Sequence, residues 1–261
     1  MNLIAGRLVS LILFVLLMAL MYYTSKRAAR GKVPEMRELP GLAAIEEGVG
    51  RCAEHGRPLH YSLGTGSFVV ERTGFAMDIT AGLDLLALTA TYAAKYNVPI
   101  LVTAMSPEVL AMGAEACRSS YEKAGRPELF KNEDMYYFPR GDYWQSGVLA
   151  LFSDKKCAAS YYIGPFWGEA VLVAEAGFRA GAFQVAGCAR YPQIPFFLVS
   201  CDYTMIGEEL FAAAAKASGD PQKIAQIQAQ DITKLITLAL GIFGLICAIA
   251  GIASIRALLR A

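Results

Sequence analysis

The chain has 261 residues, enough for one large domain or two small ones. Hydrophobic residues make up 55% of it and charged residues only 18%, which excludes an intrinsically disordered chain and indicates that part of the protein meets lipid. Lys and Arg number 24 against 23 Asp and Glu, so the net charge of +1 provides no attraction to nucleic acid.

The first predicted element is a membrane span near the N-terminus. Residues 8–25 carry no charge, and 18 residues of helix at about 1.5 Å each cover about 27 Å, close to the thickness of the hydrocarbon layer. Tyr22 and Tyr23 follow where an interfacial aromatic belt would lie. A cleaved signal peptide is the alternative, but no small-x-small cleavage site follows the apolar run, which favours a retained anchor over residues 1–25.

After a basic linker at 26–39, short apolar runs alternate with helical patterns over a central domain at 40–219. We expect an opening helix with Leu42, Ile45 and Val49 on its apolar face. We then expect strands at 59–63, 98–102, 135–138, 159–163, 182–186 and 196–200, and helices at 78–96, from 106, and at 142–153, 166–178 and 204–217. Strands that are apolar throughout and separated by helices predict an α/β, Rossmann-like layered domain with a mainly parallel sheet.

The last predicted helix starts at Asp220 and Pro221, a cap and first-turn pair. It forms a juxtamembrane stalk over 220–234 and continues without a breaker into a second span at 235–255, ahead of a tail at 256–261. The 21 uncharged residues of this span cover about 31 Å. A buried core helix is the alternative, but such helices seldom run this far without a polar stripe.

Small residues in the second span fall at intervals of three, four and three, at Gly241, Gly244, Ala248 and Gly251. This spacing places them on one face of the helix, where another helix could approach closely. The partner is either the first span or the same helix of a neighbouring subunit, and a chance run of glycines remains the alternative.

Basic residues near the spans predict the orientation, because they stay preferentially on the cytoplasmic side. Eight lie on the side of the central domain and three on the far side, namely Lys26, Arg27, Arg30, Lys32, Arg37, Lys216, Lys223 and Lys234 against Arg7, Arg256 and Arg260. We therefore expect a two-span protein of the inner membrane whose central domain is cytoplasmic. The six cysteines show no paired spacing, in agreement with a reducing compartment.

Several segments resemble a known family. These are YIGPFWGE at 162–169, QVAG at 184–187 and CDYTMIGEEL at 201–210, with AIEE at 44–47, GR at 50–51 and GRP at 56–58 in the first predicted helix and strand. They are similar to an uncharacterised, domain-of-unknown-function family of membrane-anchored bacterial and archaeal proteins. The resemblance covers most of residues 40–235 and implies membrane attachment and a common fold, without implying any catalytic role.

Motifs of known chemistry are absent from the sequence. His55 and His60 are the only histidines and have no nearby Cys pair, so no metal site is predicted. There is no phosphate-binding loop of the Gly-x-x-x-x-Gly-Lys type, no Gly-x-Ser-x-Gly elbow and no His-Glu-x-x-His helix. The residues identify no cofactor and favour a protein that is not an enzyme.

Ligands of parallel sheets bind beyond the C-terminal strand ends, and this rule selects the candidate site residues. The turn Gly64, Thr65, Gly66 and Ser67 follows the first expected strand; it lacks a third glycine and is typical of a tight structural turn, with a phosphate-facing loop as the alternative. Trp167 and Glu169 follow the strand at 159–163, and Asp202 follows that at 196–200. Glu169 is expected in a salt bridge or subunit contact unless it is catalytic, and Asp202 is expected to cap a helix near Thr204.

Two functions agree with these features. One is a membrane-anchored scaffold or compartment-forming protein that assembles laterally into a homo-oligomer, with lipid and its own copies as partners. The other is a membrane-bound enzyme or sensor that binds a nucleotide or other small molecule at the strand ends, where we expect Glu169, Asp202 and the turn at 64–67 to converge. The lack of a catalytic constellation favours the scaffold.

Overall fold

The computed structural model describes residues 8–31, 33–69, 75–139 and 141–249. The chain divides into two compact units. The helical unit comprises residues 1–36 and 219–261, and the α/β unit comprises residues 37–218.

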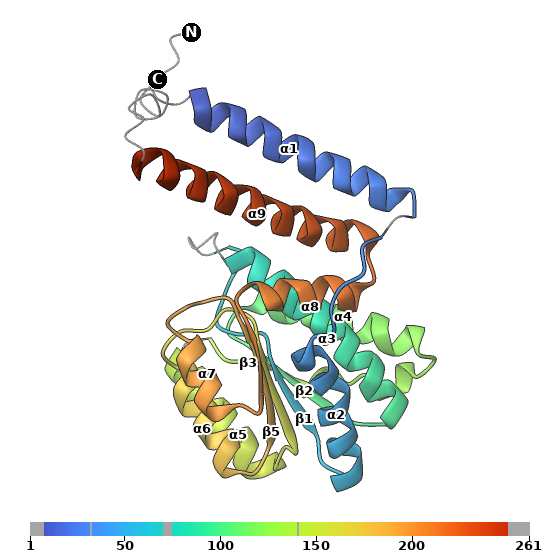
Figure 1. Cartoon of the computed structure of the whole chain (residues 1–261). Coiled ribbons are helices and arrows are strands. Elements are labelled where there is room, and N and C mark those ends of the chain that lie inside the picture. Colours follow the sequence, from blue (N-terminus) through green and yellow to red (C-terminus); the bar gives the residue numbers. More distant parts are fainter. Residues whose placement is uncertain (1–7, 32, 70–74, 140, 250–261) are drawn as a thin grey trace. The chain divides into compact units, whose positions relative to one another are not determined.

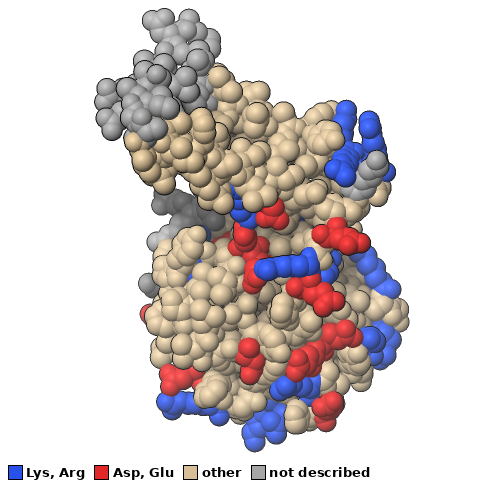
Figure 2. Space-filling view, viewed as in Figure 1, with Lys and Arg blue, Asp and Glu red and all other residues tan. Residues whose placement is uncertain are grey.

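The helical unit is an antiparallel pair of helices, α1 (Leu8–Ala29) and α9 (Pro221–Ile249), which pack side by side (Figure 1). Both are long and apolar enough to cross a membrane. Leu and Phe side chains are exposed along both helices, and Figure 2 shows a surface without charge along most of the pair. The helix α9 runs without interruption from the expected stalk into the expected span, and its start is capped where Asp220 accepts a 2.8 Å hydrogen bond from the amide of Gln222.

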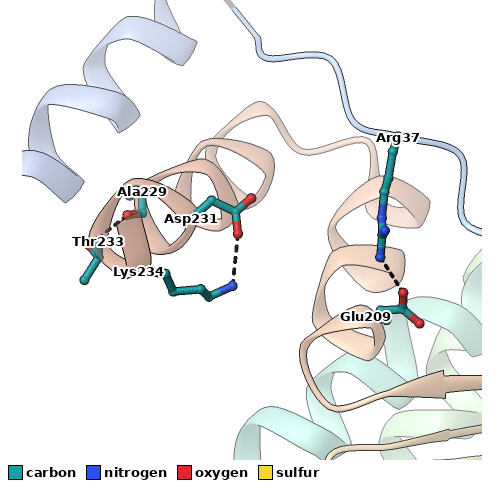
Figure 3. A network of polar contacts seen from close by, with 6 residues as sticks. All are labelled: Arg37, Glu209, Ala229, Asp231, Thr233 and Lys234. Atoms are coloured by element: carbon teal, nitrogen blue, oxygen red, sulfur yellow. Dashed lines mark hydrogen bonds and ion pairs between the residues drawn. The ribbon is translucent and has the colours of Figure 1, made fainter. Parts of the chain in front are cut away.

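Two side-chain contacts in the polar part of α9 lie within the helix itself. Nζ of Lys234 lies 3.0 Å from a carboxylate oxygen of Asp231, one turn earlier, and the hydroxyl of Thr233 donates a 2.8 Å hydrogen bond to the carbonyl of Ala229 (Figure 3). Lys234 is the last charged residue before the uncharged stretch that follows. The change from polar to apolar helix is therefore sharp.

The α/β unit is built on a six-stranded sheet in which every strand pairs in parallel with its neighbours, in the order β3-β2-β1-β4-β5-β6. The strands are β1 (Leu59–Ser62), β2 (Ile100–Ala104), β3 (Met135–Tyr137), β4 (Ala159–Ile163), β5 (Phe183–Cys188) and β6 (Tyr203–Ile206). Strands β1, β2, β4 and β5 are buried along their whole length, which is why their sequences are largely apolar and carry no charge. The predicted α/β, mainly parallel fold is confirmed.

Helices cover both faces of the sheet (Figure 1). One face carries α2 (Pro40–His55), α3 (Ala76–Tyr96), α4 (Pro107–Lys123) and α8 (Glu208–Ser218); the other carries α5 (Gly141–Lys155), α6 (Ala170–Arg179) and α7 (Ile194–Ser200). Two short 3-10 turns, at Pro127–Leu129 and Asn132–Asp134, lie between α4 and β3. A 2.5 Å ion pair between Arg37 and Glu209 fastens the first residue of the unit to α8 (Figure 3).

The structure corrects one part of the predicted element order. Residues 196–200, expected as a strand, belong to the helix α7, and the sixth strand is β6, where a helix was expected to begin near Thr204. Pro195 occupies the first turn of α7, where its missing N–H costs nothing. Only Phe197 of the apolar run is buried, whereas Phe196, Leu198 and Val199 are exposed, so the run is not an inner strand.

Candidate ligand-binding site

The order of strand addition reverses between the neighbouring strands β1 and β4. From β1 the chain continues to β2 and β3 on one side of the sheet, and from β4 it continues to β5 and β6 on the other side. Loops at the C-terminal ends of such neighbouring strands leave in opposite directions, and ligands of open α/β sheets bind in the crevice between them. The loop after β1 and the loop after β4 therefore define where a site should lie.

These two loops are packed tightly against one another at their bases. The amide of Thr65 donates a 2.8 Å hydrogen bond to the carbonyl of Pro165, and Gly64 has a φ of +82°. A Cβ atom at Gly64 would lie 2.3 Å from that same carbonyl oxygen, so no larger residue fits. Gly64 is therefore needed for the close contact between the loop after β1 and the loop after β4.

An acidic residue, Glu108, lies beside the loop after β1. The Ser67 hydroxyl donates to a carboxylate oxygen of Glu108, and the Ser106 hydroxyl donates a 2.6 Å hydrogen bond to the carbonyl of Gly66. Partial burial acts to raise the pKa of Glu108, but hydrogen bonds from Ser67 and from the backbone of Phe68 outweigh it and lower the pKa. Glu108 is therefore held ionised, and a negative charge beside the turn at 64–67 disfavours phosphate there.

A cavity of about 390 Å³ lies beyond the ends of β4 and β5. Its size is within the range of about 300–1,000 Å³ typical of small-molecule sites. The first turn of α3, the loop after β4 and the loop after β5 line it, through Asp78, Phe166, Trp167, Ala189, Arg190, Tyr191 and Pro192. A cavity thus lies at the C-terminal edge of the sheet, where the sequence predicts a ligand site.

An ion pair at this cavity joins the loop after β5 to the helix α3. Nε of Arg190 lies 3.6 Å from a carboxylate oxygen of Asp78, close enough for electrostatic attraction but too far for a hydrogen bond. The guanidinium carbon of Arg190 lies 3.6 Å from the centre of the Phe75 ring and 5.5 Å from that of Trp167. Arg190 is thus held by aromatic faces as well as by charge.

The Asp78 carboxylate is buried, with 4% of the residue exposed. Burial raises its pKa, and the charge of Arg190 opposes that rise without cancelling it. Among the residues that the structure describes, none donates a hydrogen bond to this carboxylate. Buried carboxylates in proteins normally accept hydrogen bonds, so Asp78 is an acceptor that faces a cavity with its capacity unused by the described chain.

Aromatic side chains form the walls. Trp167 is 38% exposed and packs edge to face against Phe75 at 5.8 Å, while Tyr191 is 84% exposed. Phe166 is fully buried beneath them. Exposed aromatic rings beside a charged pair provide a surface on which a flat ligand could stack.

The predicted site residues do not converge as a group. Trp167 lines the cavity and Glu169 stands nearby at the N-terminal end of α6, outside the set of lining residues. Asp202 precedes β6, and its carboxylate accepts a hydrogen bond from the amide of Gln184 at the start of β5. Because the strands are parallel, Asp202 lies at the N-terminal edge of the sheet, opposite Glu169. The expected convergence of Glu169 and Asp202 is therefore wrong, as is the expected capping role of Asp202.

A second polar cluster lies inside the sheet. The ring nitrogens of His60 are 2.8 Å from the Ser160 hydroxyl and 3.0 Å from the Thr103 hydroxyl, and all three residues are fully buried. Burial lowers the pKa of His60 to about 3. The cluster joins a histidine to two hydroxyls, but it has no exposure to solvent, so it supports packing of three neighbouring strands rather than chemistry.

Among the described residues, no group of three or more His, Cys, Asp or Glu side chains could hold a metal ion. Of the spans' predicted small-residue face, Gly241 and Gly244 have open space where a Cβ would stand, so α1 does not cover them. Gly251 lies outside the described residues, as does the side chain of Ala248.

Comparison with known proteins gives a family and no activity. The family model described as "Domain of unknown function (DUF6754)" matches residues 2–259. No curated protein and no solved structure matches the chain.

Proposed function

Since the chain belongs to the DUF6754 family, which carries no assigned activity, we propose from its geometry that it is a membrane-anchored domain that binds a small molecule in the cavity beside Asp78 and Arg190. The observation that carries the proposal is a cavity of ligand size that meets a buried carboxylate and exposed aromatic rings beyond the ends of parallel strands. Binding without catalysis is the simpler form, because the lining residues that the structure describes include no nucleophile paired with a base.

We further propose that α1 and α9 span the inner membrane and that the α/β unit is cytoplasmic. The exposed apolar side chains of both helices support this location, because so large an apolar surface is unfavourable in water. The excess of basic residues next to the α/β unit supports the orientation.

Ligand binding is tested on the full-length protein in mild detergent, by thermal unfolding and by tryptophan fluorescence. Trp167 is the exposed reporter, whereas Trp144 is buried. The probes are guanosine, choline and benzoate, which represent a neutral polar ring, a cation and an anion. A probe at about 100 times its Kd stabilises the folded state by about 2.7 kcal/mol.

We expect at least one probe to raise the unfolding temperature and to change the fluorescence of Trp167, and we expect Arg190→Ala to abolish both effects. Arg126→Ala serves as the matched control, because Arg126 is an exposed arginine that does not line this cavity. If none of the three probes produces a saturable change, the small-molecule proposal fails.

Lateral assembly into a homo-oligomeric scaffold is the second candidate. It is favoured by the uncovered face of α9 at Gly241 and Gly244, where a helix of another subunit could pack closely. Assembly and ligand binding involve different units of the chain, so either can hold without the other.

A further inference from the structure

We propose that the ligand is a neutral purine-type ring that presents two adjacent N–H donors to the Asp78 carboxylate, an inference that rests on the proposed small-molecule function. The donors are required by Asp78 itself, which accepts no hydrogen bond from the described chain. A carboxylate has two oxygens side by side, and the ring N–H and exocyclic amino group of a 2-amino-6-oxopurine match them as a fork.

The charges of the cavity select against the simple ions. A ligand cation would compete with the guanidinium of Arg190, which already occupies the faces of Phe75 and Trp167. A ligand anion that approached Arg190 would also approach the carboxylate of Asp78, only 3.6 Å from Nε. A neutral ring that presents donors to Asp78 avoids both conflicts.

The walls of the cavity agree with a flat ring. Tyr191 exposes aromatic surface next to the charged pair, and nucleobases stack readily on such a side chain because each base has a π-face.

The other loops at the C-terminal edge of the sheet limit which substituents the purine ring can have. The bases of the loops after β1 and β4 are packed together, and Glu108 is held ionised beside the turn at 64–67. The ionised carboxylate disfavours a phosphate on that side of the edge, and the cavity of about 390 Å³ is at the small end of the range for ligand sites. The geometry therefore points to a base or nucleoside without phosphates.

The test compares guanosine with inosine, which lacks the 2-amino group, and with adenosine, which lacks the adjacent pair of donors. Titrations use the full-length protein in detergent and follow the fluorescence of Trp167. We expect guanosine to bind saturably and inosine to bind at least about tenfold more weakly, because one hydrogen bond to a buried carboxylate is lost. This comparison needs no variant.

Asp78→Asn replaces one acceptor oxygen by a donor, and we expect it to remove the preference for guanosine over inosine. Asp84→Asn, on the same helix and outside the cavity lining, should keep it. Equal affinities for guanosine and inosine would overturn the assignment of Asp78. Binding of choline or benzoate that depends on Arg190, without binding of guanosine, would overturn the purine while leaving the small-molecule function intact. Failure of every probe would overturn that function as well.

Discussion

His60 limits the stability of the fold at acid pH. Its folded pKa of about 3 lies below the ordinary value near 6.5, so the unfolded chain binds a proton that the folded chain does not. The stability from keeping this imidazole neutral is fully present above pH 6.5 and is lost as the pH falls toward 3. Each pH unit in this window removes about 1.4 kcal/mol.

We therefore predict that His60→Asn is less stable than the natural chain at pH 7.5 but loses less stability between pH 6.5 and 5. The asparagine keeps a polar group for Ser160 or Thr103 and does not titrate. Thermal unfolding in detergent, followed by circular dichroism at several pH values, measures the two slopes. His55→Asn is the control, since His55 is exposed and should leave the slope unchanged. Identical slopes for all three proteins would contradict the assignment.

Gly64 is one of the positions where the backbone permits no side chain. We predict that Gly64→Ala destabilises the α/β unit by about 2–5 kcal/mol, because alanine disfavours a φ of +82° and its Cβ would collide with the carbonyl of Pro165. Gly168→Ala, in the loop after β4, meets nothing within 4 Å and should change stability by less than about 0.5 kcal/mol. Equal thermal stability of the two variants would show that the loops can separate freely.

The site residues differ in how far the sequence could identify them. The sequence identifies Trp167 because it lies in the loop after a strand whose five residues are all apolar or aromatic except Ser160. Arg190 is absent from the predicted site although the same rule applies to it, since it follows the end of β5 by two residues. Asp78 lies at the start of a helix, far along the chain from β5, and only the sheet order brings the two together.

At the scale of elements, α7 and β6 are the two that the hydrophobic pattern of the sequence does not predict correctly. A short apolar run fits an inner strand and a one-sided helix equally well, and length does not separate them at seven residues. Pro195 was the available signal, because proline fits the first turn of a helix and disrupts an inner strand. The longer helices, whose apolar spacing extends over several turns, were predicted correctly, including the continuous α9.

The uncovered face of α9 gives a test of assembly. We predict that Gly241→Leu with Gly244→Leu leaves membrane insertion intact but reduces the particle size in mild detergent, because bulk on this face prevents close packing of a second helix. Ala239→Leu adds similar bulk on another face of the helix, about 200° around the axis from Gly241, and should leave the particle size unchanged. Analytical ultracentrifugation provides the measurement. An unchanged size in the double variant would remove the reason to assign this face to assembly.

For the whole molecule, the proposed orientation predicts which side of the membrane each unit occupies. The native cysteines are poor reporters, since Cys52, Cys117 and Cys157 are buried and burial raises the pKa of each thiol to about 12. Glu54→Cys places a thiol on the exposed side of α2, and Asn2→Cys places one beyond the first span. An impermeant maleimide should label only the second in spheroplasts and both after lysis. Labelling of the first before lysis would reverse the topology.

The strand order also bears on how the protein emerges from the ribosome. The two central strands, β1 and β4, are separated by the whole of β2 and β3, so the first three strands can pair among themselves while β1 keeps one edge open. When β4 is made it occupies that edge, and β5 and β6 then add in turn, each beside the strand made just before it. A nascent chain that stops before residue 159 therefore exposes one edge of β1, a strand that is buried along its whole length in the complete sheet. The growing sheet is most vulnerable to wrong pairing during synthesis of β3 and α5, and is protected once β4 has joined.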